Sequence, residues 1–332
     1  MLALSGARHP RGGQFHTSTN APETEELHCV PQDVKSDTTF RIPIIDFSKF
    51  RSATSLSEKR RTADEIVSGF KEVGFIYLEK HGIPRPIALI QVSCKSAEFF
   101  NLPAEVKDRL AWEDPRANRG YVKPPDFKET MEIGRDWDKT WKNRWPEESA
   151  VPGFRETMLH LFQECHDLHT LVMRAIAIGL DLEERFFDNK INEQYHNLRL
   201  LSYPPIKRQL LEEEGQARAG AHSDYGTLTL LFQDSVGGLE VQNPHTKQFQ
   251  PATPISGTIV VNAGDLLARW SNDVLRSTLH RVVAPPARQI NATESITPRA
   301  QSIAFFCNPN QGRAHRVPPD VHAGRPGEVL PP

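Results

Sequence analysis

The chain has 332 residues, of which 38% are hydrophobic and 25% are charged, and its formal net charge is -2. This length is enough for one large globular domain or two modest ones. A charge so close to zero gives no basic surface for nucleic acid or for an anionic membrane. No apolar run reaches the roughly 18 to 20 residues that span a bilayer. The composition therefore predicts a soluble globular protein without a nucleic-acid or membrane partner, and we expect a monomer.

The cysteines are few and scattered, and no two form a C-x-x-C pair. This spacing argues against a disulfide scaffold or a thiolate zinc site, and it fits a reducing compartment. Cys165 lies on the apolar side of a predicted helix, so we expect it to be buried. The other three are Cys29, Cys94 and Cys307.

Residues 1–38 are predicted to be a disordered leader. The first twenty contain two arginines and several hydroxyl side chains but no acidic residue. These are features of a mitochondrial transit peptide, although the stretch has little amphipathic helical character. We therefore expect a cytoplasmic protein, with a mitochondrial location as the alternative.

Residues 39–190 are predicted to be a largely helical region that contributes the first strands. Runs dense in β-branched and aromatic residues indicate strands, and apolar residues at steps of three and four indicate helices. In chain order we predict a strand at 40–47, a helix at 57–73, a strand at 75–78, a helix at 87–100, a polar and proline-rich stretch, and a long helix at 154–180.

Residues 191–310 have a different character, because short strand-like runs alternate with Gly, Pro, Asn and Asp. Many short strands at close spacing are typical of an antiparallel barrel or jelly roll. The predicted runs are 198–203, 227–234, 238–243, 257–270, 277–283 and 302–308. The fold class is therefore mainly β with flanking helices (α+β), and residues 311–332, rich in Pro, Gly and Arg, are predicted to be a disordered tail.

The triplet His222-Ser223-Asp224 is the clearest chemical signal in this region. A histidine and a carboxylate two residues apart on an extended segment project from the same face. His280 lies on a later strand-like run, 56 residues after Asp224. Two imidazoles and one carboxylate on one side of a metal are the facial arrangement of oxygen-activating non-haem Fe(II) sites. An H-x-D triplet alone is common by chance, so the spacing leaves metal binding open.

Several longer segments resemble successive motifs of the 2-oxoglutarate/Fe(II)-dependent dioxygenase superfamily, in its isopenicillin N synthase-like branch. The resemblance covers about residues 40–310, and agreement across several spaced motifs is far more specific than the triplet. The segments are IPIIDFSKF, GFIYLEKHGIP, LRLLSYPP, HSDYGTLTLLFQDSVGGLEV, VVNAGDLLARWSND, STLHRV and SIAFFCNPN.

The resemblance implies a double-stranded β-helix (jelly roll) core and a specific set of site residues. His222, Asp224 and His280 match the iron ligands of the family. Tyr203 matches a tyrosine near the keto acid, and Ser302 matches a serine that holds the distal carboxylate of 2-oxoglutarate together with a nearby arginine. A planar guanidinium suits that role because it binds a carboxylate through two parallel hydrogen bonds.

The arginine departs from the family pattern. The family usually has Arg-x-Ser, whereas this chain has Arg299-Ala300-Gln301-Ser302. In a regular strand Arg299 would point away from Ser302, although a bulge would restore it. Arg299 is our predicted 2-oxoglutarate contact, with Arg288 as a distant second. The loop after Tyr121 and the C-terminus are also short for the family.

The resemblance predicts an oxidoreductase that couples oxidative decarboxylation of 2-oxoglutarate to oxidation of a small organic metabolite. Fe(II) is the expected metal, and 2-oxoglutarate and O2 are the expected cosubstrates. The outcome would be hydroxylation, desaturation or cyclisation, in a pocket lined by residues 119–129 and residues near Phe232 and Trp270. The alternatives are an iron oxidase of the same branch that does not use 2-oxoglutarate, or a non-catalytic member.

Overall fold

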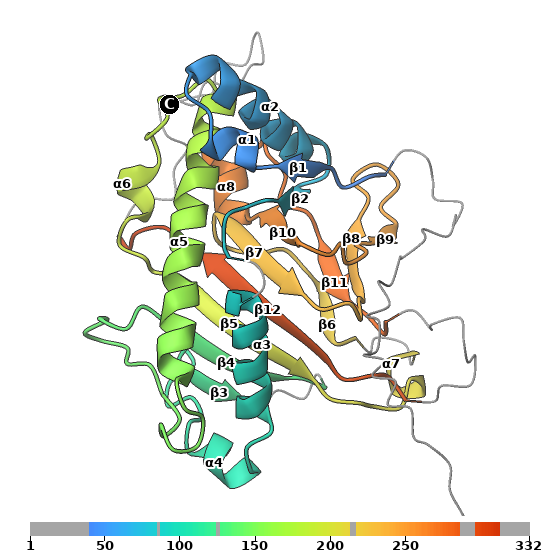
Figure 1. The fold of residues 1–332 in the computed structure, drawn as a ribbon. Helices are drawn as coiled ribbons and strands as arrows, with labels where there is room; N and C mark the ends of the chain where they lie inside the picture. Colours follow the sequence, from blue (N-terminus) through green and yellow to red (C-terminus); the bar gives the residue numbers. More distant parts are fainter. Residues whose placement is uncertain (1–39, 85–86, 124–126, 213–216, 286–295, 313–332) are drawn as a thin grey trace, which may run out of the picture. The chain divides into compact units, whose positions relative to one another are not determined.

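Twelve strands in two sheets frame the segments that carry the predicted metal ligands (Figure 1). The computed structural model describes residues 40–84, 87–123, 127–212, 217–285 and 296–312. The larger sheet has the strand order β1-β2-β10-β7-β12-β5-β4-β3, and of its neighbouring pairs only β1 and β2 are parallel. Its strands are β1 (Ile44–Asp46), β2 (Phe75–Glu79), β3 (Gly120–Val122), β4 (Glu129–Gly134), β5 (Asn197–Tyr203), β7 (Leu228–Gln233), β10 (Thr258–Ala263) and β12 (Ala300–Cys307).

The smaller sheet is antiparallel throughout and has the order β6-β11-β8-β9. Its strands are β6 (Ala219–His222), β8 (Leu239–Gln242), β9 (Phe249–Pro251) and β11 (His280–Val282). Two mainly antiparallel sheets with helices beside them are the predicted α+β, jelly-roll architecture, and this prediction is confirmed.

The strands of the larger sheet have two different faces, as β12 illustrates. Successive side chains of a strand point to opposite sides. Ile303 and Phe305 belong to the main hydrophobic core, whereas Ser302, Ala304 and Phe306 line a cavity. The sheet therefore separates a helix-covered core from the cavity between the two sheets.

The core face is covered by helices, and α5 (Phe154–Gly179) lies across the sheet in Figure 1. It contacts β7, β12, α2 (Leu56–Glu72) and α3 (Ile87–Phe100). A capping box begins α2, because Ser55 Oγ accepts from the Glu58 amide and the Glu58 carboxylate accepts from the Ser55 amide. The shorter helices are α1 (Ser48–Arg51), α4 (Ala104–Asp108), α6 (Asp188–Ile191), α7 (Gln209–Glu212) and α8 (Asp265–Trp270). No described helix is long and apolar enough to cross a bilayer.

Three predictions about the elements were wrong or incomplete. The run 257–270 is a strand only as far as Ala263, because Gly264 ends β10 and residues 265–270 form α8. The run 40–47 has only three strand residues. The proline-rich middle section contains β3 and β4, which complete the edge of the larger sheet beside β5. Residues 1–38, 124–126 and 313–332 and Arg288 lie outside the described residues, and the boundary predicted at 190/191 stays a prediction.

Two cysteines lie in the core as free thiols. Cys165 on α5 and Cys307 at the end of β12 are both 0% exposed, which agrees with the expectation for Cys165. Burial raises the pKa of both thiols well above its ordinary value. Cys94 is exposed and also free, and Cys29 lies outside the described residues.

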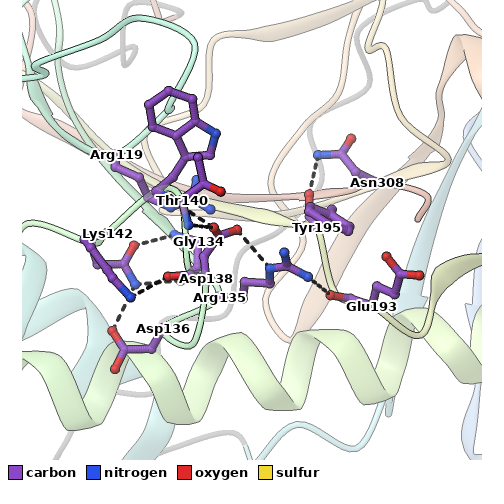
Figure 2. Close-up of polar contacts among 12 residues, drawn as sticks. Arg119, Gly134, Arg135, Asp136, Asp138, Thr140, Lys142, Glu193, Tyr195 and Asn308 are labelled. Atoms are coloured by element: carbon purple, nitrogen blue, oxygen red, sulfur yellow. Dashed lines mark hydrogen bonds and ion pairs between the residues drawn. The ribbon is translucent and has the colours of Figure 1, made fainter. Parts of the chain in front are cut away.

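A polar cluster joins the ends of three strands of the larger sheet (Figure 2). Arg135, just after β4, donates from Nε to Asp138 Oδ2 at 3.0 Å and from Nη1 to the Glu193 carbonyl at 2.8 Å. Its guanidinium carbon lies 3.6 Å from the ring centroid of Tyr195. The side-chain amide of Asn308 donates to the Tyr195 carbonyl at 3.0 Å. The start of β5 and the end of β12 are thereby held against the end of β4.

Candidate metal centre and active site

The structure brings the three predicted metal ligands together on the smaller sheet. His222 at the end of β6 and His280 at the start of β11 are direct Cα partners, and Asp224 follows β6 by two residues. Nε2 of His222 is 3.9 Å from Asp224 Oδ1, and Nε2 of His280 is 3.8 Å from Asp224 Oδ2. One ligand atom from each residue lies within 4.8 Å of the others. These are two imidazoles and one carboxylate on one side of a common point, as the triplet predicted.

Backbone carbonyls set the tautomer of both imidazoles. Nδ1 of His222 lies 2.7 Å from the Gly220 carbonyl, and Nδ1 of His280 lies 3.1 Å from the Thr278 carbonyl. A carbonyl only accepts, so each neutral ring carries its proton on Nδ1 and has its lone pair on Nε2. Burial lowers the pKa of His280. These lone pairs are on the nitrogens that face Asp224, which is the form in which imidazole binds a metal.

Two polar side chains of the larger sheet orient the Asp224 carboxylate. Thr229 Oγ1 donates to Asp224 Oδ2 at 2.6 Å, and Asn262 Nδ2 donates to the same oxygen at 2.8 Å. Thr229 and Asn262 are Cα partners between β7 and β10. Sequence reasoning missed both, although each is a buried polar residue on a mostly apolar strand. Such partners hold a ligating carboxylate in a fixed orientation.

Close backbone packing holds the turn that carries Asp224. The Asp224 carbonyl accepts from the amide of Asp265 at 2.7 Å, at the start of α8. A Cβ on Gly264 would lie 2.3 Å from the Gly226 carbonyl oxygen, and one on Gly226 would lie 2.3 Å from the Cys307 carbonyl oxygen. Glycine is therefore needed at both positions, because the backbones approach too closely for any side chain.

A cavity of about 150 Å³ opens beside the triad, between the two sheets. Its apolar walls come from Phe75, Leu201, Leu231, Leu239, Val282, Ala300, Ala304 and Phe306, and its polar groups include Lys128, Arg199, Tyr203, Arg218, Gln233 and Ser302. The neighbours of Phe232 do line it, but Phe232 itself is on the core face of β7, and Trp270 packs in the core against Phe187. The core position of Trp270 agrees with the expectation that it packs in the core, whereas the residues near it do not line this cavity.

The three predicted 2-oxoglutarate contacts do not come together. Tyr203 is 5% exposed and lines the cavity with Ser302. Burial raises the pKa of Tyr203, while the adjacent Ser302 side chain lowers it by less. Arg299, in contrast, is exposed and donates from Nη1 to Asn101 Oδ1 at 2.7 Å. Residues 300–307 form a regular strand without a bulge, so Arg299 stays outside the cavity and Ala300 faces into it.

Two arginines that sequence reasoning did not consider do line the cavity. Arg199 on β5 forms a 2.6 Å ion pair with the buried Glu132. Arg218, just before β6, is 1% exposed and places its guanidinium carbon 5.2 Å from the Tyr203 ring centroid. No sequence signal identified Arg218, because the pairing of β6 with β11 is irregular between Ala219 and His222, and strict alternation along this segment fails.

The comparisons with known proteins agree with this geometry. Residues 42–148 match the family described as "non-haem dioxygenase in morphine synthesis N-terminal", and residues 193–309 match the "2OG-Fe(II) oxygenase superfamily". The "2-oxoglutarate-Fe(II) type oxidoreductase ppzD" of Metarhizium majus is 33% identical over 308 residues, which are 82% of this chain and 86% of that protein. The chain belongs to the 2-oxoglutarate/Fe(II)-dependent oxygenase superfamily.

Solved structures support the same assignment. Full-length Neurospora crassa thymine 7-hydroxylase, in complex with alpha-KG (2-oxoglutarate) and 5-formyluracil, is 47% identical with a TM-score of 0.81, over 86% of this chain and 90% of that one. The "Proline hydroxylase buaE" of Petromyces alliaceus is 34% identical over 74% of this chain and 81% of that protein. The chain is thus a 2-oxoglutarate-dependent dioxygenase that uses Fe(II) and oxidises a small molecule, as predicted. This favours it over an iron oxidase or a non-catalytic member.

The oxygenase contains a second group of three histidines, in its core between α5 and the larger sheet. His166, His169 and His196 also bring ligand atoms within 4.8 Å of one another. The Asn308 amide donates to His196 Nδ1 at 3.0 Å, so neutral His196 carries its proton on Nε2, which faces His166 Nδ1 at 3.0 Å. A protonated ring nitrogen has no lone pair for a metal.

Hydrogen bonding also determines which nitrogen of His169 carries the proton. Thr227 Oγ1 donates to the Cys307 carbonyl at 3.0 Å, so His169 Nε2, 3.0 Å from that hydroxyl, is the donor between them. Its Nδ1 is buried and has no hydrogen-bond partner among the described residues. Burial lowers the pKa of His169 to about 3. We interpret the second group as neutral core histidines whose hydrogen bonds compete with metal binding.

The neutral state of His169 predicts an acid-sensitive fold. The folded protein keeps His169 neutral down to about pH 3, whereas in the unfolded chain it binds a proton near its ordinary pKa of 6.5. Between these values the unfolded state binds more protons, so stability falls as the pH is lowered, by up to about 1.4 kcal/mol per pH unit for one such group. His169→Gln, whose amide can still donate to Thr227, is expected to flatten this slope.

Urea unfolding of both proteins at several pH values between 4 and 7 would measure the two slopes. An exposed histidine, His160, serves as the matched control, and the slope of His169→Gln is compared with that of His160→Gln. Equal slopes for the wild type and His169→Gln would contradict the assignment of a neutral His169.

Proposed function

We propose that His222, Asp224 and His280 hold the Fe(II) and that the adjacent cavity binds 2-oxoglutarate and the substrate. The observation that carries this proposal is the convergence of two Nε2 lone pairs and one carboxylate beside a cavity between the sheets. His222 is about half exposed at its side chain, whereas His280 and Asp224 are buried. The site is therefore buried at His280 and Asp224 and accessible to solvent at His222.

Bound iron and 2-oxoglutarate supply the activation of O2 in this family, and the protein's own residues provide orientation and shielding. Thr229 and Asn262 occupy Asp224 Oδ2, which favours Oδ1 as the ligating oxygen. Tyr203 and Ser302 give hydroxyl groups to the part of the cavity assigned to the keto acid. The apolar walls exclude water from the reacting atoms.

Replacing a proposed ligand should remove metal binding and turnover together. We expect His222→Ala and His280→Ala to lose Fe(II) binding and substrate-dependent release of CO2 from 2-oxoglutarate. Asn262→Ala keeps all three ligands but frees the Asp224 carboxylate, so its metal affinity should fall by about 10- to 100-fold. Anaerobic calorimetric titration with Fe(II) and a CO2-release assay would measure these effects.

His169→Gln is the matched control for these variants, since the second histidine group is assigned no metal, and it should bind Fe(II) as the wild type does. Wild-type affinity in His280→Ala, or loss of the metal in His169→Gln, would contradict the assignment of the ligands.

We further propose that the substrate is a small polar ring compound of the pyrimidine nucleobase class. Support comes from the Neurospora crassa thymine 7-hydroxylase, whose structures contain 5-formyluracil or thymine at 47% and 44% identity to this chain. The cavity is small, and it offers Lys128, Arg199 and Gln233 as hydrogen-bonding groups among apolar walls. A planar molecule with carbonyl and N–H groups suits such a lining.

A substrate panel tests this class. The iron-loaded enzyme would be incubated with 2-oxoglutarate and thymine, 5-formyluracil or free proline, and succinate and oxidised product would be measured by mass spectrometry. We expect succinate to rise at least about tenfold over the substrate-free rate with a pyrimidine but not with proline. Turnover of proline alone would instead favour the activity named for the Petromyces alliaceus relative.

We also propose that the enzyme works as a monomer in a reducing compartment. We expect this compartment to be the cytoplasm, with the mitochondrion as the alternative. The free, buried thiols of Cys165 and Cys307 support the reducing compartment, and the monomer is the expectation from the sequence. Size-exclusion chromatography with light scattering should give a mass near 37.5 kDa, and a C-terminal fluorescent fusion should be diffuse in cells. A dimer mass, or fluorescence confined to mitochondria, would contradict these two expectations.

A further inference from the structure

The side chain of Arg218 is a buried guanidinium that forms no ion pair with a carboxylate among the described residues. It is 1% exposed, and Nη2 donates to Thr297 Oγ1 at 2.8 Å, with longer contacts to the carbonyls of Pro204 at 3.4 Å and Pro298 at 3.5 Å. Its Nε is buried and has no hydrogen-bond partner among the described residues. A buried charge is costly unless it is paired and fully hydrogen-bonded. The open donor therefore indicates a site for an anion.

The guanidinium lies in the same cavity as the metal triad. Arg218, just before β6, and His222, at the end of β6, both line the cavity. The guanidinium carbon is 5.2 Å from the ring centroid of Tyr203, whose Cα partner on β12 is Ala300. Because Ala300 has only a methyl group facing the cavity, it leaves room beside Tyr203 and Ser302 for the longer side chain of Arg218.

Three other described cations considered for this role already have partners. Arg199 is ion-paired with Glu132, and Arg299 lies outside the cavity on Asn101. Lys128 lines the cavity but donates to the Arg218 carbonyl at 3.3 Å. A lysine also presents a point charge, whereas a guanidinium offers the fork that matches a carboxylate.

Two described acidic residues line the cavity, Asp224 of the triad and Asp234. Asp234 lines the cavity, but its oxygens accept from the amides of Val236 at 2.9 Å and Gln301 at 2.6 Å. It is not within ion-pairing distance of Arg218 in the described structure. Asp234 therefore does not accept a hydrogen bond from the Nε of Arg218 in the described structure.

We propose that Arg218, rather than Arg299, receives the distal carboxylate of 2-oxoglutarate, with Ser302 and Tyr203 beside it. This inference rests on the proposed function, since it assumes that the keto end of the cosubstrate lies at the triad. Arg218 then performs from the segment before β6 the role that sequence comparison assigns to an arginine on β12.

Binding of two keto acids to the metal-loaded enzyme without O2 tests this role. 2-Oxoglutarate has a second carboxylate and pyruvate does not, so only the former can use the guanidinium. In calorimetric titrations of the Mn(II)-loaded protein, Arg218→Met should weaken 2-oxoglutarate binding about 30-fold or more, as expected for loss of one partner of a buried charge pair. Pyruvate binding should change by less than about threefold. Arg218→Lys keeps the charge but loses the two parallel N–H donors, so its affinity for 2-oxoglutarate should lie between those of the wild type and Arg218→Met.

Arg299→Gln is the matched control, and it should change the affinity for neither keto acid by more than about twofold. The proposed function fails if the wild type, loaded with metal, does not bind 2-oxoglutarate at all. The role of Arg218 fails if the wild type binds it and Arg218→Met binds it equally well, or if Arg299→Gln produces the loss instead. Equal losses for both keto acids in Arg218→Met would also overturn it, because they would indicate a general structural defect.

Arg218 is buried, so thermal unfolding of each variant with Mn(II) must accompany the titrations. If neither variant folds, a crystal structure of the wild type with metal and 2-oxoglutarate decides the question. A distal carboxylate oxygen within about 3.2 Å of the Arg218 guanidinium supports the proposal, and one on Arg299, Arg199 or Lys128 refutes it.

Discussion

The antiparallel pairing of β6 with β11 places the Cα atoms of His222 and His280 directly opposite each other, so both imidazoles project from one face of the smaller sheet. A shift of one residue would turn one imidazole to the other face and destroy the site. β11 has only three residues, but its register is fixed from the other side by β8, where Val241 is the partner of His280. The Phe75 ring, from the larger sheet, packs against the His280 ring in a T-shaped arrangement at a centroid distance of 5.3 Å.

Hydrogen-bond direction distinguishes the two histidine groups, which distance alone does not. Both groups bring three ligand atoms within the same 4.8 Å. At the active site the second ring nitrogens face carbonyls, which leaves the lone pairs of His222 and His280 available. In the core, a backbone amide faces His196 and forces the proton onto the nitrogen that a metal would need. A metal site thus depends on the acceptors behind its ligands as much as on the ligands themselves.

The sequence was sufficient to predict features with a strong local pattern. The long helix at 154–180, the short strands after Asn197 and the His-x-Asp…His spacing all correspond to described elements. The features that it missed depend on tertiary contacts. β4 pairs with β5, and the three-residue β3 pairs in turn with β4, so both depend on a partner that is distant in the sequence. Thr229 and Asn262 become functional only because β7 and β10 place them side by side under Asp224.

The arginine beside Ser302 shows the same limit. Strand alternation predicted correctly that Arg299 would point away from Ser302. It did not indicate which arginine lies near Ala300, because Arg218, the residue that we propose for this role, comes from the segment that leads into a strand of the other sheet. A sequence motif on one strand identifies only the residues of that strand that line a cavity. The residues that line it from the other sheet are known only once the fold is known.

The burial of Cys165 and Cys307 has a consequence for the durability of an enzyme that handles O2 beside iron. Peroxide and related by-products attack thiolates, and reaction with the protonated thiol is slow. The raised pKa of these two thiols keeps them protonated, and their position in the core limits the access of oxidants. The packing that anchors α5 against β12 therefore also protects the enzyme from self-inflicted oxidation, and it leaves the exposed Cys94 as the first described thiol to be modified.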